Sequence, residues 1–395
     1  MFSDLLSYDE AVASIRSHVN CLNRRANRPV SESLGLAIAA DLFSPTDNPL
    51  FDNSAVDGYA VSSDSDAVEG RVLVIEGSNA AGESAGNLIA PGTARRILTG
   101  APTPTNTYGI VMQENTEVTG GAIRLLASTS VGAHIRRRGS DFRTGDCLLP
   151  VGSVIGPGQA AVLAFAGCTV ANVFLPPKVS VVTTGDELVD PSEEPSGPMI
   201  RDTNSVMLSA QVKAATARSP RVRRVSDRMD MFCQVLAKEA GVSDVILVAG
   251  GASVGDRDLL ETAMKQMGIV IFHGVSMRPG KPFLFGKLGN ALVFGLPGNP
   301  ASAFVCFEIF VRAALRSLGG WRSPEINWIH LPAGFVHPAV GREDFVRVVY
   351  NSGKLQVTRE QGSFGLASLA TAHALARFPA EQSTVNGQLC PVLIL

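Results

Sequence analysis

The amino-acid sequence predicts a multidomain α/β protein built around a doubly wound, mostly parallel α/β domain. Length is the first reason, because 395 residues are more than one ordinary hydrophobic core encloses. The second reason is the alternation of strand-like and helix-like runs between 179 and 318, as in VSVVTTG followed by SVMLSAQVKAATA. The third is a change of texture on both sides of that stretch, where short β-rich runs take over.

Four domains are predicted from these changes. Residues 1 to about 45 have a helical pattern that ends near SPTDNP, because Pro45 and Pro49 prevent helix continuation. Runs such as RVLVIEG and AIRLLAS indicate a small β module, and runs such as FVRVVYN indicate a β domain after Trp321. The predicted domains are a discontinuous helical and linker domain over 1–50 and 146–176, an inserted small β module over 51–145, the α/β domain over 177–321 and a C-terminal β domain over 322–395.

Composition and charge exclude several classes of protein. The formal net charge is −2, from 34 basic and 36 acidic residues, so nothing attracts the whole chain to nucleic acid or to an anionic membrane, and any anion site must be local. The most apolar stretch, 160–175, is too short for a bilayer span and is expected to be a core helix leading into a strand. Six cysteines without a CxxC pair argue against a zinc ribbon or a disulfide framework. Without a secretory signal pattern, the cytoplasm is the expected location.

Four polar or Gly-rich loops follow strands of the predicted sheet. They are TTGDEL (183–188), GGASVGDRD (250–258), MRPGKP (277–282) and GLPGNP (295–300). Ligands of such sheets bind beyond the carboxyl ends of the strands, so these loops are expected to converge on one ligand.

The loops combine cation ligands with anion ligands. Oxygen ligands suited to Mg²⁺ come from Thr183, Thr184, Asp186, Glu187, Asp202, Asn204, Asp256 and Asp258. The backbone of Gly250, Gly251 and Gly255, together with Ser253, can accept a phosphate. Arg278 and Lys281 add positive charge.

Structural interpretations compete with these functional ones. GGASVGDRD is equally well explained as a tight strand-to-helix turn whose aspartates cap the following helix. Asn299, considered singly, is better explained as an N-cap before Pro300. The segment IRRRGSDFRTGD packs four arginines around Asp141, and such a run is usually a solvated surface. Its glycines make it a loop, however, and loops on a rigid scaffold more often carry function.

The motifs of several common enzyme classes are missing from the chain. The sequence has no P-loop, no G-x-G-x-x-G after the strands, no H-E-x-x-H and no G-x-S-x-G. Kinase, dehydrogenase, zincin and hydrolase functions therefore lose support.

Seven motifs in this order resemble the MoeA family of molybdopterin molybdenumtransferases, which includes the E domain of gephyrin. The motifs are SAVDGYAV, ILTGAP, RRRGSD, TTGDEL, GGASVGDRD, RPGKP and LPGNP. The resemblance implies an α/β domain of the molybdopterin-binding type. It also implies Mg²⁺-dependent insertion of molybdate into adenylylated molybdopterin, with release of AMP and of the finished molybdenum cofactor. The family is similar, too, in forming homodimers in which the β module of one subunit faces the α/β domain of the other.

The resemblance assigns roles to residues by motif. Its functional polar positions are Asp57, Thr99, Asp141, Glu187, Asp227 and Asp258. Those expected to hold Mg²⁺ are Glu187, Asp258 and Asp186, and the cofactor phosphate is assigned to Gly250, Gly251, Ser253 and Gly255. Molybdate or phosphate is assigned to Arg278 and Lys281, and Pro297, Gly298 and Asn299 are also expected to bind the cofactor. A family arginine matches either Arg342 or Arg347, and a serine near the molybdate pocket matches either Ser363 or Ser368.

The chain departs from the family pattern at Arg278, where lysine is common. Arginine keeps the charge and gains bidentate reach to an oxyanion, so function is expected to be kept with altered affinity. The connection before Asp227 is also compressed.

Two alternative functions stay open at this point. One is a molybdopterin adenylyltransferase that makes the pterin adenylate from ATP, and the other is a non-catalytic scaffold of the same fold. The expected partners are a second copy of the chain, small-molecule substrates, an upstream adenylyltransferase and downstream molybdoenzyme chaperones, without nucleic acid or membrane. The sequence does not distinguish molybdate from tungstate as the substrate.

Overall fold

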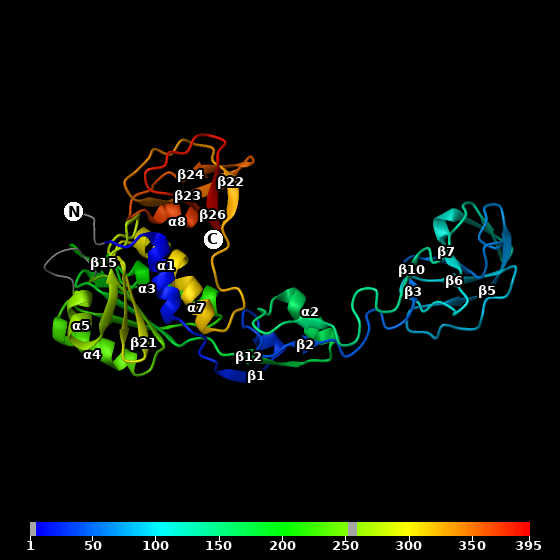
Figure 1. Cartoon of the computed structure of the whole chain (residues 1–395), viewed down its shortest axis with the longest axis horizontal. Helices are drawn as coiled ribbons and strands as arrows, with labels where there is room; N and C mark the ends of the chain where they lie inside the picture. Colours follow the sequence, from blue (N-terminus) through cyan, green and yellow to red (C-terminus); the bar gives the residue numbers. More distant parts are fainter. Residues whose placement is uncertain (1–4, 252–258) are drawn as a thin grey trace. The chain divides into compact units, whose positions relative to one another are not determined.

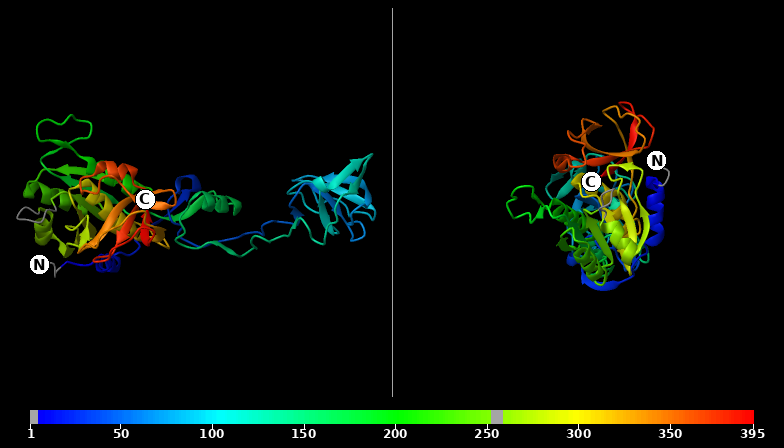
Figure 2. Two further views of the ribbon diagram at one scale, coloured as in Figure 1. Left: turned by 90° about the horizontal axis from the view of Figure 1, so that it is seen from above. Right: turned by 90° about the vertical axis from the view of Figure 1, so that its left-hand side faces the viewer.

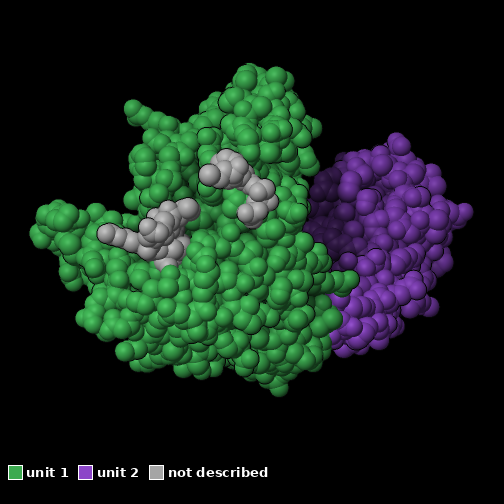
Figure 3. Space-filling model, turned by 60° about the vertical axis from the view of Figure 1, so that its left-hand side comes forward, with its two compact units in different colours: residues 1–40, 151–161, 168–395 green, residues 41–150, 162–167 purple. Residues whose placement is uncertain are grey.

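The computed structural model describes residues 5–251 and 259–395, and the chain forms two compact units (Figure 3). Unit 1 comprises residues 1–40, 151–161 and 168–395, and unit 2 comprises residues 41–150 and 162–167. The four-domain division predicted from the sequence is finer than this one and stays a prediction.

The central sheet of unit 1 has six strands in the order β16-β13-β17-β21-β20-β18. The part of the chain that forms it is drawn in green to yellow in Figures 1 and 2. The strands are β13 (Val179–Thr184), β16 (Arg221–Val225), β17 (Val245–Ala249), β18 (Ile269–His273), β20 (Leu284–Leu288) and β21 (Ala291–Leu296). Strands β16, β13, β17 and β21 are parallel, which confirms the predicted α/β sheet. Strand β20 is antiparallel to β21 because only Gly289 and Asn290 separate them, a connection that permits only a hairpin.

Helices cover both faces of this sheet. One face carries α1 (Tyr8–His18), α3 (Thr203–Thr216), α6 (Pro300–Cys306) and α7 (Arg312–Leu318), and the other carries α4 (Met229–Ala240) and α5 (Leu259–Met267) (Figure 1). Successive strand residues point to opposite faces, so Val181 packs in the first core and Val182 in the second. A π-helical turn over Phe307–Val311 joins α6 to α7.

The four predicted ligand loops follow strands that all end on the same side of the sheet, at the carboxyl ends of its parallel strands. Parallel strands β13, β17 and β21 end there. Strand β18 is antiparallel to β20, and β20 is antiparallel to β21. Strand β18 therefore runs in the same direction as β21 and ends on the same side of the sheet. The prediction that these loops follow the carboxyl ends of the strands is therefore confirmed, and their convergence on one ligand stays a prediction.

The prediction that residues 1 to about 45 are helical is wrong beyond His18. Helix α1 itself is well specified, because Ser7 and Glu10 form a reciprocal capping box at its N-terminus. After it, β1 (Arg25–Pro29) pairs antiparallel with β12 (Val170–Phe174). This long-range pairing overrides the weak local helical pattern.

The apolar stretch 160–175 forms a helix followed by a strand, as predicted, but the helix is not part of the core. Helix α2 (Pro157–Phe165) buries only Leu163. Among the described residues, no helix is both long enough and apolar enough to cross a membrane.

One strand of the C-terminal sheet of unit 1 comes from the α/β region. The order of this sheet is β19-β23-β25-β26-β22, with β24 beside β23. The elements are β19 (Met277–Arg278), β22 (Ile329–Pro332), β23 (Glu343–Asn351), β24 (Lys354–Val357), β25 (Ala374–Phe378), β26 (Leu389–Ile394) and α8 (Leu366–Thr371). The predicted C-terminal β structure is thus present, and β19 extends it from the loop MRPGKP.

Unit 2 is the predicted β-rich stretch, with a six-stranded sheet in the order β7-β4-β6-β5-β9-β8. The strands of unit 2 are β2 (Leu42–Phe43), β3 (Asn53–Ser54), β4 (Gly58–Val61), β5 (Val72–Asn79), β6 (Thr93–Ile97), β7 (Gly109–Met112), β8 (Thr116–Thr119), β9 (Ala122–Leu125), β10 (Ile135–Arg136) and β11 (Cys147–Leu149). In unit 1, the short strands β14 (Leu188–Val189) and β15 (Ile200–Arg201) pair with each other.

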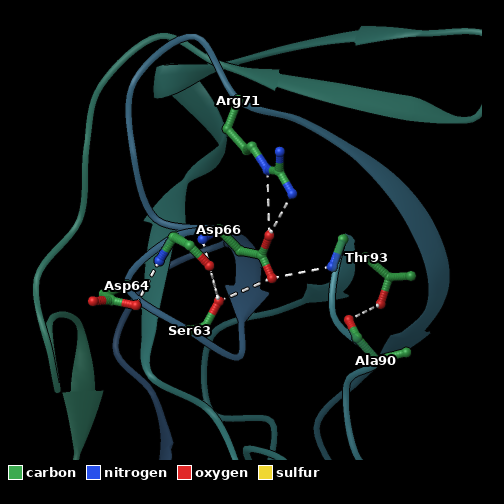
Figure 4. Close-up of polar contacts among 8 residues, drawn as sticks. Ser63, Asp64, Asp66, Arg71, Ala90 and Thr93 are labelled. Atoms are coloured by element: carbon green, nitrogen blue, oxygen red, sulfur yellow. Dashed lines mark hydrogen bonds and ion pairs between the residues drawn. The ribbon is translucent and has the colours of Figure 1, made fainter.

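A buried carboxylate holds the connection between β4 and β5 (Figure 4). The Asp66 side chain is 2% exposed and accepts hydrogen bonds from Ser63 Oγ at 3.0 Å, Gly92 N at 3.1 Å and Arg71 Nη2 at 3.2 Å. Burial raises the pKa of this carboxyl, but the bonds from Gly92, Ser63 and Arg71 outweigh burial and leave the pKa below its ordinary value. Asp66 therefore stabilises unit 2 in its charged form.

Replacing Asp66 by Asn is expected to destabilise unit 2 by about 2–3 kcal/mol near pH 7, because charge-assisted bonds in a buried site are lost. A carboxyl with a lowered folded-state pKa contributes stability above its unfolded pKa of about 3.9 and loses that contribution as the pH falls below it. The deficit of Asp66→Asn should therefore shrink toward about pH 3.

Calorimetric unfolding of the full chain across this pH range measures the deficit. The exposed neighbour Asp64 provides the matched control, Asp64→Asn, because within the described residues its carboxylate accepts a hydrogen bond only from the adjacent Ser65 N. A deficit that is absent, or equal at both ends of the pH range, would contradict the assignment.

Candidate functional site

The loops after β13, β17 and β21 pack against one another through close backbone contacts. Gly250 has a φ of +93°, and a Cβ on it would lie 2.4 Å from Thr184 O. A Cβ on Gly298 would lie 3.5 Å from Gly250 Cα. Asn204 Nδ2 donates to Gly298 O at 2.7 Å, which brings the start of α3 to the same place. The structure thus brings the predicted residues Gly250 and Gly298 next to each other.

Acidic residues surround the turn that follows β13. Thr184 Oγ1 donates to Asp227 Oδ1 at 2.6 Å, and Asp227 N donates to Asp186 Oδ1 at 3.1 Å. The Glu187 carboxylate folds back over Gly185, where a Cβ would lie 2.6 Å from Glu187 Oε2. Despite the compressed connection before it, Asp227 therefore reaches the loop that carries Asp186 and Glu187.

Asp202, predicted among the oxygen ligands, has a structural role. Its side chain is buried, accepts from Thr183 Oγ1 at 2.7 Å and caps α3 by accepting from Ser205 N at 3.0 Å. Each carboxylate oxygen thus accepts a hydrogen bond, and Asp202 joins the end of β13 to the start of α3.

Part of the predicted metal and phosphate site cannot be placed. Ser253, Gly255, Asp256 and Asp258 lie outside the described residues. Within 5–251 and 259–395, no group of three or more His, Cys, Asp and Glu side chains forms a metal site. Asp186 and Glu187 still present hard oxygen donors beside the glycine loop, which is the donor chemistry that Mg²⁺ takes when phosphate oxygens complete its shell.

A cavity of about 610 Å³ opens between the loop MRPGKP and the C-terminal sheet. The charged and polar residues along it include Arg278, Lys281, His337, Arg342, Asp344 and Ser363. Arg278 forms a bidentate ion pair with Asp344, with Nε 3.2 Å from Oδ1 and the Nη2–Oδ2 contact beside it. Hydrogen bonding to Asp344 raises the pKa of Arg278. Three basic residues in one cavity suit an oxyanion.

The two alternatives that the sequence left open separate by location. Arg342 and Ser363 line the cavity, whereas Arg347 is fully buried and donates from Nε to Ser368 Oγ at 2.8 Å. Arg347 Nη2 also donates to Gly362 O at 3.0 Å and so holds the cavity wall from behind.

The turn LPGNP lies between the glycine loop, which it contacts through Gly298, and Ser363 of the cavity. Asn299 Nδ2 donates to Ser363 Oγ at 3.0 Å, and Ala301 N donates to Ser363 O at 3.0 Å. Asn299 occupies the N-cap position of α6, but its side chain makes no capping hydrogen bond. The interpretation of Asn299 as a simple N-cap is therefore wrong, because the amide is used to position Ser363.

In unit 2, Asp57 and Thr99 are brought together from distant motifs. Asp57 Oδ1 accepts from Thr99 N and from Thr99 Oγ1, both at 2.7 Å. These bonds, the backbone bond first, lower the pKa of the Asp57 carboxyl.

The predicted cluster of arginines around Asp141 is wrong in its pairing. Arg137 binds Asp52 at 2.6 Å and Arg138 binds Asp47 at 2.6 Å. Asp141 instead accepts from Asn48 Nδ2 at 2.9 Å. The arginines find partners on the opposite strand segment because the chain returns there as a ribbon, with β3 paired to β10.

Two cavity residues, Asp344 and His337, were not predicted as site residues. A usable signal lies in GREDFVR, because alternate residues of a strand share a face and Arg342 and Asp344 are two apart. The same alternation places Arg347 on the other face. No comparable pattern surrounds His337.

Comparisons with known proteins agree along the whole chain. Residues 6–167 match the MoeA N-terminal region, domains I and II, and residues 180–317 match a probable molybdopterin binding domain. The molybdopterin molybdenumtransferase of Haemophilus influenzae is 31% identical over 360 residues, covering 89% of each chain. Molybdopterin molybdenumtransferase 2 of Mycobacterium tuberculosis is 31% identical over 365 residues, covering 89% of this chain and 90% of that protein.

The crystal structure of a molybdopterin biosynthesis moeA protein from Pyrococcus horikoshii OT3 matches with a TM-score of 0.82 at 26% identity, covering 99% of this chain and 100% of that one. Sequence and fold thus agree over nearly the full length, and the chain belongs to the MoeA family of molybdopterin molybdenumtransferases.

Proposed function

We propose that this protein catalyses the Mg²⁺-dependent insertion of molybdate into adenylylated molybdopterin, with release of AMP and of the molybdenum cofactor. The observation that supports it most is the position of the turn LPGNP. Through Gly298 it contacts Gly250 of the glycine loop and Asn204 at the start of α3, and through Asn299 it holds Ser363, which lines the basic cavity. A phosphate-bearing pterin and a free oxyanion require two such neighbouring sites.

The adenylate phosphates are assigned to Gly250 and Gly251, at the carboxyl end of strand β17. Bare backbone N–H groups can approach an anion there without steric hindrance. Asp186 and Glu187 would hold Mg²⁺, together with Asp258 from outside the described residues, and the ion would neutralise phosphate charge when bound. Asp227 would orient this loop, because its backbone N–H fixes the Asp186 carboxylate.

Molybdate is assigned to the cavity of Arg278, Lys281, Arg342 and Ser363. Molybdate is a tetrahedral dianion, and guanidinium groups bind such oxyanions with parallel N–H donors. Ser363, held by Asn299, offers a hydroxyl at the side nearest the glycine loop. The residues thus bind and orient the oxyanion close to where the pterin adenylate is assigned.

A scaffold function is the second candidate, and one observation favours it. A cavity of about 640 Å³ in unit 1 is lined by aromatic and apolar side chains that include Tyr8, Phe310 and Trp328. Among the residues that the structure describes, it shares no lining residue with the basic cavity, and a scaffold needs no AMP release. Molybdate-dependent AMP release therefore separates the two functions.

Other parts of the proposal rest on the family resemblance alone. These are homodimer formation, a cytoplasmic location, the partners upstream and downstream, and the contributions of Asp57, Thr99 and Asp141 to the reaction.

Replacing Glu187 by Ala is expected to lower the rate of molybdate-dependent AMP release by about 100-fold, because a preorganised charged group at the reacting phosphate is lost. The Mg²⁺ concentration needed for half-maximal rate should rise in the same variant. AMP release is followed by chromatography with purified protein, pterin adenylate and molybdate. Glu193→Ala, on the exposed neighbouring loop, is the matched control. An unchanged rate and Mg²⁺ response in Glu187→Ala would refute the assigned role.

The two serines should respond differently to replacement by Ala. Ser363→Ala is expected to raise the KM for molybdate about tenfold, equal to ~1.4 kcal/mol, with stability almost unchanged. Ser368→Ala is expected to lower the free energy of unfolding by about 1–3 kcal/mol, because it leaves Arg347 Nε buried without its partner. Steady-state kinetics and chemical denaturation measure the two effects. If Ser368 bound molybdate in place of Ser363, the KM for molybdate would rise in Ser368→Ala and not in Ser363→Ala.

A further inference from the structure

Arg278 is held at one edge of its guanidinium by a carboxylate of another sheet. Strand β19 pairs with β23 so that Arg278 stands directly opposite Asp344. Arg278 Nε lies 3.2 Å from Asp344 Oδ1, and Nη2 contacts Oδ2. The Asp344 side chain is 4% exposed, whereas that of Arg278 is 56% exposed. A buried anchor thus fixes a side chain that would otherwise move freely in solvent.

This geometry leaves a second edge of the guanidinium available. Arginine carries five N–H donors in a planar fork, and the contact with Asp344 uses the Nε and Nη2 side of that fork. The edge formed by Nη1 and Nη2 is a second bidentate surface, and it matches two oxygens of an oxyanion. A lysine at this position has no second edge, since its ammonium is a single point charge.

His337 lies beside the same carboxylate, next to the oxygen that Arg278 Nη2 contacts. His337 Nε2 lies 3.2 Å from Asp344 Oδ2, and the His337 ring packs edge-on against Phe378 with centroids 4.2 Å apart. Burial lowers the pKa of His337, with Asp344 opposing this effect and Arg278 adding to it.

We propose that Asp344 is a positioning residue for oxyanion recognition. It holds Arg278 with the Nη1–Nη2 edge available to the cavity, so that a tetrahedral dianion is recognised by direction as well as by charge. The inference rests on the proposed function, which places molybdate in this cavity.

The proposal predicts the opposite sign to a purely electrostatic role. If Asp344 only offset the positive charge of the cavity, removing its charge would strengthen the binding of a dianion. If Asp344 positions Arg278, the same change releases a half-exposed side chain that must then be ordered on binding, so the affinity falls.

Asp344→Asn is the direct test. We expect the KM for molybdate to rise about tenfold, while kcat and the KM for pterin adenylate stay within about twofold. Adding Asp344→Asn to Arg278→Ala should raise the molybdate KM no further, because the positioned group is already gone. Asp230→Asn is the matched control, since Asp230 holds Arg228 in the same bidentate way on an exposed surface, with Nη2–Oδ2 at 2.8 Å.

Arg278→Lys keeps the test available if Asp344→Asn does not fold, because residue 278 is exposed. Its charge is retained and its second edge is lost, so we expect the same rise in molybdate KM. A molybdate KM that falls or stays constant in Asp344→Asn, or in Arg278→Lys, would overturn the proposal. So would an equal effect of Asp344→Asn with and without Arg278.

Calorimetric titration with molybdate alone separates this proposal from the proposed function. If the unaltered protein released no AMP, the proposed function would fail. The dissociation constant of molybdate would still be compared between the unaltered protein and Asp344→Asn. Weaker binding in the variant supports positioning, whereas equal or tighter binding refutes it.

Discussion

The pairing of β19 with β23 is the constraint on which the basic cavity depends. It takes two residues of a loop from the α/β sheet, Met277 and Arg278, and makes them a strand of the C-terminal sheet. Because the register of a strand fixes which residues face each other, Arg278 is placed opposite Asp344. The loop that follows then forms one wall of the cavity, and the C-terminal sheet forms the other.

Helix α6 connects this cavity to the loops at the carboxyl ends of the parallel strands. The turn after Arg278 requires a glycine, since Gly280 has a φ of +113° and a Cβ on it would lie 2.5 Å from Cys306 Sγ at the end of α6. The other end of α6 begins at LPGNP, which contacts Gly250 and Ser363. One short helix is thus packed against the basic loop at its C-terminal end and against the glycine loop at its N-terminal end. Rigid elements of this kind position polar groups more precisely than free loops do.

Much of the fold could be predicted from local pattern. The strands and helices from 179 to 318 have apolar runs of clear period, and the β-rich runs of unit 2 are bounded by turn residues, so each was identified with little outside information. The failure between His18 and Phe43 has a different cause. There the chain forms β1 by pairing with Val170–Phe174, which is too distant in sequence for a local pattern to indicate.

The site was predictable to the extent that its chemistry is carried by loops. Asp186, Glu187 and Asp227 were identified from their motifs and do surround one turn. Motifs could not choose between Arg342 and Arg347, because Arg342 directly precedes β23 and Arg347 lies within it. Only the folded structure shows that Arg342 lines the cavity and that Arg347 is buried. Asp344 was missed because an acidic residue in a strand has the pattern of an exposed position. Its burial depends on Arg278, which is remote in sequence.

The central claim is that the acidic loops at the carboxyl ends of the strands and the basic cavity form one site, with LPGNP between them. The most direct measurement is a crystal structure of the protein soaked with tungstate, whose anomalous scattering locates the oxyanion without ambiguity. We expect a single strong peak within hydrogen-bonding distance of Arg278, Arg342 and Ser363. A peak bound elsewhere, with this cavity empty at saturating tungstate, would contradict the account.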